Sequence, residues 1–82
     1  MNELIQNIDQ LHTTKMGVDR IKRNLSLATD DVVGWCKTKI LNERASVARK
    51  GKNWYIRLDG CEITVNAHSY TIITAHKTLL LS

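Results

Sequence analysis

Three residues in the last third of the chain have side chains suited to proton transfer: His68, His76 and Glu62. Cleavage of RNA without a metal needs a base that takes the proton of the 2′-hydroxyl and an acid that protonates the departing 5′-oxygen. Histidine suits both steps because it titrates near neutral pH. The two histidines, or one histidine with Glu62, are therefore the catalytic candidates. For each histidine the alternative is a surface or hydrogen-bonding role.

The spacing of the two histidines bears on whether they can act as a pair. His68 falls at a predicted turn and His76 near the far end of the next predicted strand. At about 3.4 Å per residue, the two would lie roughly 20 Å or more apart. A direct pair would then need a bent strand or a homodimer.

Positive charge and polar side chains surround these candidates. The chain has a net charge of +4, and residues 32–82 hold eight Lys/Arg against three acids, whereas residues 1–31 hold four against five. Such an excess indicates a surface for a polyanion, with an ordinary solvated surface as the alternative. The residues predicted to bind nucleic acid or a partner are Arg49, Lys50, Lys52, Trp54, Tyr55, Arg57, Thr64, Asn66, Tyr70 and Lys77.

Motifs for other chemistries are absent from the sequence. There is no GxxxxGK[ST] phosphate loop, no HExxH metal motif and no GxSxG nucleophile motif. Cys36 and Cys61 form no CxxC pair, and we expect free thiols in a reducing compartment, with no metal and no cofactor. No apolar run is long enough to span a bilayer, and the polar N-terminus is unlike a signal peptide. These features predict a cytoplasmic protein that does not bind membranes.

Hydrophobic periodicity predicts a helical half, 1–42, and a sheet half, 45–77, within a single domain, 1–82. A helix of about three turns is expected where apolar residues recur at Leu4, Ile5, Ile8 and Leu11. A second apolar stripe, which follows the potential caps Thr13 and Thr14, contains Val18, Ile21 and Leu25. A third helix, with Thr29 as its expected N-cap, buries Val32, Val33, Cys36 and Ile40.

The period changes to two after residue 45, which predicts strands. They are expected at 46–50, around Ile56, around Ile63 and at 70–75, and Asp59-Gly60 is typical of a type I′ hairpin turn. The predicted fold class is α+β, with two or three N-terminal helices packed on a three- to four-stranded antiparallel β-meander. The face that the last strand presents depends on loop 67–69 and stays open. The apolar tail 79–81 is expected to dock on the core or on a partner. The predicted core residues are Trp35, Ile40, Trp54, Ile56, Ile63 and Val65.

Two resemblances add to this interpretation. The run GKNWYIRLDGCEITVNAHSYTIITAHK resembles the hallmark of a family of small bacterial proteins catalogued as a domain of unknown function, number 3781. The segments GVDRIKRNL and DVVGWCKTKI are similar to its N-terminal half, so the resemblance spans about 8–77. It implies no activity. The stretch ITVNAHSYTIITAHK is also similar to the barnase- and colicin-like ribonucleases, which implies a toxin-type nuclease without assigning any residue a role.

Three functions therefore remain as hypotheses. The first is a domain that binds RNA or another nucleic acid. The second is a metal-independent endoribonuclease of toxin type on the same surface. The third is a non-catalytic inhibitor or regulator, such as a phage-encoded anti-defence factor or a toxin–antitoxin partner, that binds a protein or ribonucleoprotein complex.

Overall fold

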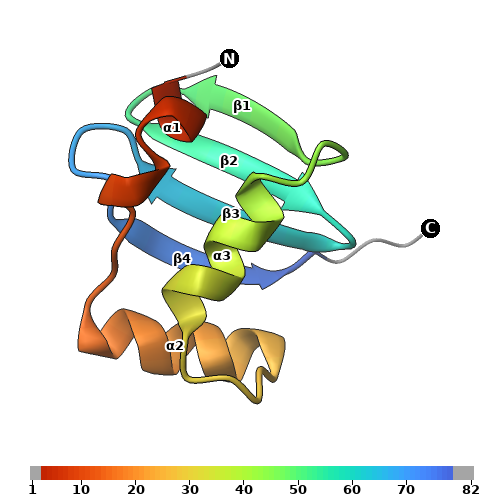
Figure 1. The fold of residues 1–82 in the computed structure, drawn as a ribbon. Coiled ribbons are helices and arrows are strands. Elements are labelled where there is room, and N and C mark those ends of the chain that lie inside the picture. The colour runs from red at the N-terminus through yellow and green to blue at the C-terminus, as the bar shows by residue number, and fades with distance from the viewer. Residues whose placement is uncertain (1–2, 79–82) are drawn as a thin grey trace.

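The computed structural model describes residues 3–78, in which three α-helices precede a four-stranded antiparallel sheet (Figure 1). The helices are α1 (Glu3–Gln6), α2 (Lys15–Leu25) and α3 (Val32–Ile40), with a 3-10 turn, η1 (Ile8–Gln10), after α1. The strands are β1 (Ser46–Lys50), β2 (Asn53–Leu58), β3 (Cys61–Asn66) and β4 (Ile72–Lys77), paired in the order β1-β2-β3-β4. The predicted α+β meander is thus confirmed. The tail 79–81 lies outside the described residues.

The N-terminal helix is shorter than its apolar spacing predicts. Asn7 leaves the helical region at φ −114° and ψ 28°, which separates α1 from η1. Its side-chain amide donates to the Glu3 carbonyl at 3.0 Å, and its side-chain oxygen accepts from Gln10 at 3.1 Å. Asparagine side chains compete with the backbone for such bonds, which accounts for the break. Leu4 and Leu11 are nevertheless buried, so the apolar stripe still faces the core.

Side-chain caps fix where α2 and α3 begin. Thr14 accepts a bond from the Gly17 N–H at 2.9 Å and caps α2, as expected. For α3 the predicted cap, Thr29, is wrong: Asp31 is the N-cap and accepts from the Gly34 N–H at 3.0 Å. A Cβ at Gly34 would collide with the Asp31 carboxylate, so a glycine there makes room for the cap.

Two-residue turns set the register of the first three strands. Asp59 and Gly60 have φ of 51° and 76°, the positive values that a type I′ turn requires, so this predicted hairpin is confirmed. Gly51 has φ 62° in the two-residue turn between β1 and β2. The first two hairpins therefore pair their strands without a break.

The core lies between the helices and one face of the sheet. In Figure 1, α3 crosses that face and α2 runs beside β4. Of the six predicted core residues, Trp35 is only partly buried, and the other five are buried. Within residues 3–78, no helix has the length and apolar character needed to cross a bilayer.

A β-bulge decides which face β4 presents. Thr64 pairs with Thr74 and Val65 with Ile72, which leaves Ile73 as an extra residue in β4. Ile72 and Ala75 are therefore both buried, and Ile73 is 39% exposed. Because the bulge shifts the alternation by one residue, His76 lies on the side of the sheet opposite the helices.

Candidate functional site

The sheet face opposite the helices is lined mainly by polar side chains, and we call it the open face. The strand pairing joins Tyr55 to Thr64, and Thr64 to Thr74, across this face. Thr64 is buried among its neighbours, whereas Tyr55 and Thr74 are half-buried. The open face includes Tyr55, Arg57, Glu62, Thr64, Thr74 and His76, and the alternate residues of β1 that pair beside them, Ser46, Ala48 and Lys50.

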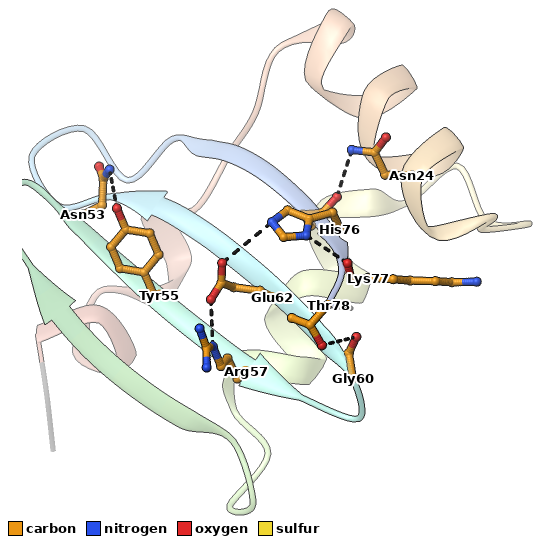
Figure 2. A network of polar contacts seen from close by, with 10 residues as sticks. Asn24, Asn53, Tyr55, Arg57, Gly60, Glu62, His76, Lys77 and Thr78 are labelled. Atoms are coloured by element: carbon orange, nitrogen blue, oxygen red, sulfur yellow. Dashed lines mark hydrogen bonds and ion pairs between the residues drawn. The ribbon is translucent and has the colours of Figure 1, made fainter. Parts of the chain in front are cut away.

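Arg57, Glu62 and His76 form a row across β2, β3 and β4 (Figure 2). Arg57 Nε donates to Glu62 Oε2 at 2.8 Å, and His76 Nε2 lies 3.7 Å from Glu62 Oε1. The Glu62 side chain is only 15% exposed, whereas those of His76 and Arg57 are 45% and 70% exposed. The pairing of one histidine with Glu62, one of the two predicted combinations, is thus present in the structure.

A backbone contact orients the His76 ring. Its Nδ1 lies 3.1 Å from the Lys77 carbonyl oxygen. A carbonyl oxygen only accepts hydrogen bonds, so we assign the proton of the neutral ring to Nδ1. Nε2 is the other ring nitrogen, and it is the atom that faces Glu62.

The row lines an open hollow of about 840 Å³ at one end of the sheet. This volume falls within the roughly 300–1,000 Å³ typical of ligand sites. Lys77 and Arg44 also line the hollow. A second hollow shares Arg57 and Glu62 and continues over Tyr55 to Lys50 in β1. The two hollows share Arg57 and Glu62 and together form what we call the groove, which is lined by basic side chains and by the Glu62–His76 pair.

Arg44 was missed in the sequence because it lies in the connector between α3 and β1, where no periodicity applies. Its N–H donates to the Asn42 side-chain oxygen at 2.8 Å, in a local turn that sets the course of the connector. The available signal for this turn was Asn42, two residues before Arg44, because asparagine favours such turns. The signal is a weak one.

The structure does not bring His68 into this site. His68 lies in the β3–β4 loop and lines a separate hollow with Arg49 and Lys52. Asn66 shapes that loop: its side-chain oxygen accepts from the N–H groups of His68 and Ser69, both at 2.9 Å. The predicted alternative of two histidines acting together is therefore not formed within this chain.

Two of the three aromatic candidates belong to the core. Trp54 is 3% exposed and Tyr70 is 9% exposed, and their ring centroids lie 5.4 Å apart. Neither ring is available for a ligand to stack on. Tyr55 is the aromatic candidate on the open face, and its hydroxyl oxygen accepts from Asn53 at 3.4 Å.

The buried cysteine and the absence of a metal cluster limit other chemistry in the described part of the chain. Burial raises the pKa of the Cys36 thiol to about 12, so Cys36 is a poor nucleophile. No group of three or more His, Cys, Asp or Glu side chains in residues 3–78 could hold a metal ion.

The fold and the row on its open face define a small α+β domain with a paired glutamate and histidine on a four-stranded sheet. The chain belongs to the family described as a protein of unknown function (DUF3781), whose sequence model matches residues 5–76. This confirms the first resemblance. The resemblance to ribonucleases is not supported, since no curated protein and no solved structure matches the chain.

Proposed function

We propose that this protein binds single-stranded RNA along its open face and cleaves it there without a metal ion. The observation that carries the proposal is the row Arg57–Glu62–His76, which places a carboxylate between a guanidinium and an imidazole. These are the three kinds of group that phosphodiester cleavage by an internal 2′-hydroxyl requires.

The proton transfers assign a role to each residue. Glu62 takes the proton of the 2′-hydroxyl as its oxygen attacks phosphorus, and the bond from phosphorus to the 5′-oxygen breaks. His76 Nε2 gives its proton to that leaving oxygen. The products are a 2′,3′-cyclic phosphate and a 5′-hydroxyl. Afterwards the proton on Glu62 passes back to His76, across the 3.7 Å that separates them.

The charge of Arg57 and the exposure of His76 suit the roles that this reaction gives them. Arg57 uses Nε on Glu62, which leaves its other N–H donors for a phosphate oxygen. The His76 side chain, 45% exposed, has room to turn away from Glu62 so that the two groups flank a bound phosphodiester. Arg44, which lines the same hollow, adds positive charge where negative charge builds in the transition state. Lys77 also lines the hollow, but its ammonium group points away from the row (Figure 2).

The groove beyond the row supports binding of the rest of the strand. Lys50 and the half-buried ring of Tyr55 line its continuation over β1 and β2. Basic side chains that follow a backbone, with an aromatic ring for a base, are typical of proteins that bind single strands. A cytoplasmic location accompanies this proposal, because RNA is abundant there and both cysteines are free thiols.

The proposal is tested by incubating purified protein with single-stranded RNA in EDTA. We expect cleavage by the wild type, and a loss of roughly a hundredfold or more in rate for Glu62→Gln and His76→Ala. The matched control is Glu3→Gln, the same chemical change at an exposed position in α1, which should retain the rate. If the RNA stayed intact at high protein concentration, the proposal that the protein cleaves RNA would be wrong. A stoichiometric protein partner in a pull-down would then favour the inhibitor hypothesis.

A further inference from the structure

A second group of basic side chains lies at the other end of the sheet. Arg49, Lys52 and His68 line one hollow together with Asn66 and Ala67, and we call it the basic hollow. It lies where the β1–β2 turn meets the β3–β4 loop, at the left end of the sheet in Figure 1, whereas the β2–β3 turn beside the catalytic row is at the right. The two sites are thus separated along the strands.

Hydrogen bonds hold the two loops of the basic hollow together. The Ala67 N–H donates to the Lys52 carbonyl at 2.8 Å, which joins the turn to the loop. Arg49 Nε donates to the Gly51 carbonyl at 3.1 Å, and its guanidinium carbon lies 5.3 Å from the centroid of the Trp54 ring. The Asn66 side chain bonds the loop backbone. The basic side chains therefore project from a framework that is already formed.

The charge of the basic hollow is unbalanced. No acidic side chain lines it, and none of the ion pairs in residues 3–78 involves Arg49, Lys52 or His68. This differs from the catalytic row, where Glu62 already balances Arg57. Arg49 and Lys52 are positively charged and have no carboxylate partner in this hollow, so an anion bound there is attracted to both.

We propose that the basic hollow is a subsite for a backbone phosphate of the same RNA strand, several nucleotides away from the bond that is cleaved. This inference rests on the proposed function and adds a requirement for substrate length. From Glu62 to Asn66 the strand β3 advances four residues, which is about 14 Å at ~3.4 Å per residue. A dinucleoside monophosphate has a single phosphodiester and cannot occupy both sites. A longer strand can occupy both.

The subsite is tested with the double variant Lys52→Ala/His68→Ala, which leaves Arg49 and its contact with Trp54 in place. The matched control, Lys15→Ala/Arg23→Ala, removes charge from exposed positions in α2. Binding of a non-cleavable 2′-methoxy oligonucleotide is measured against salt concentration. Each phosphate contact contributes about −0.7 to the log–log slope, so losing one contact should make the slope of the subsite variant shallower by that amount. The control should retain the wild-type slope.

Cleavage kinetics give the second readout. For a long RNA, the subsite variant should show KM raised about fivefold or more, since a lost contact to charge is worth at least that factor, with kcat unchanged. For a dinucleoside monophosphate both constants should equal those of the wild type. Equal salt slopes in the wild type and the variant would overturn the subsite. An equal loss of kcat/KM on the long RNA and on the dinucleoside monophosphate would also overturn it. If the wild type binds RNA, the variant's salt slope is shallower by the expected amount and neither substrate is cleaved, cleavage fails and the phosphate subsite stands. If the wild type binds no RNA, both proposals fail.

Discussion

His76 and Glu62 are directly paired on neighbouring strands, with His76 Nε2 3.7 Å from Glu62 Oε1. The bulge at Ile73 makes this relationship compatible with the burial of Ile72. In an uninterrupted strand Ile72, Thr74 and His76 would share one face, and the burial of Ile72 would turn His76 toward the helices. The bulge thus accommodates one extra residue while Ile72 stays in the core and His76 stays on the open face.

The bulge can be tested with single-residue deletions in β4. Deleting Ile73 should restore regular pairing, because Ile72 and Ala75 would then alternate with Thr74 and His76 without interruption. We expect this variant to fold, and to retain the contact between His76 and Glu62 in NMR spectra. Deleting Ala75 instead shifts His76 into a buried position. The variant that lacks Ala75 should therefore unfold at a lower temperature than the variant that lacks Ile73. The opposite order of the two melting temperatures would contradict the role of the bulge.

The Asp59-Gly60 turn should depend on the backbone of its second residue. Gly60 has φ 76°, and no atom lies within 4 Å of the position of a Cβ, so a substitution meets strain rather than a collision. Gly60→Val should lower the free energy of unfolding by about 1 kcal/mol or more. Gly60→Asn should cost less, since asparagine tolerates positive φ. Urea unfolding curves measure both, and an unchanged midpoint for the valine variant would contradict the turn.

Ile63 and Ile73 give a matched pair of isoleucines in neighbouring strands. Ile63 is 2% exposed in the core and Ile73 is 39% exposed at the bulge. Truncating Ile63 to alanine should cost about 2–5 kcal/mol of unfolding free energy, whereas Ile73→Ala should cost less than about 1 kcal/mol. Similar losses at the two positions would mean that the sheet does not bury one face of β3 as described.

The two cysteines should differ in reactivity. Burial raises the pKa of Cys36 from its ordinary 9.0 to about 12, so a thiol reagent at about pH 8 should label Cys61 alone in the folded protein and both residues in denaturant. Stability should also fall as the pH rises from 9.0 toward about 12, because the unfolded chain releases the Cys36 proton first. Labelling of Cys36 in folded Cys61→Ser protein would contradict its burial.

Local signals account for most of the fold that the sequence predicts. Apolar alternation places β2 and β3, Asp59-Gly60 marks their hairpin, and Thr14 caps α2. The errors arise where short polar side chains compete with the backbone, at Asn7 and Asp31. A bulge has no signature in a β-branched run, so the face of the last strand could not be predicted.

The site was predictable only in part, because its geometry depends on register. Glu62 and His76 are recognisable as proton-transfer residues, but their contact requires the pairing of β3 with β4. The sequence analysis put Arg49 and Arg57 in one set of binding residues, whereas the structure places Arg57 in the row with Glu62 and His76 and Arg49 at the opposite end of the sheet. Trp54 fits both a core and a stacking role in the sequence, and burial assigns it to the core.

The most direct test of RNA cleavage uses a DNA oligonucleotide that carries a single ribonucleotide, incubated with the protein in EDTA. Attack by a 2′-hydroxyl can occur only at that ribonucleotide. The wild type is therefore predicted to cut once, directly after it, to leave a 2′,3′-cyclic phosphate there and to spare an all-DNA strand. Glu62→Gln and His76→Ala should slow the cut by roughly a hundredfold or more while keeping the wild-type melting temperature. No cut, a cut in the all-DNA strand, or equal rates in the two variants and the wild type would contradict the proposal.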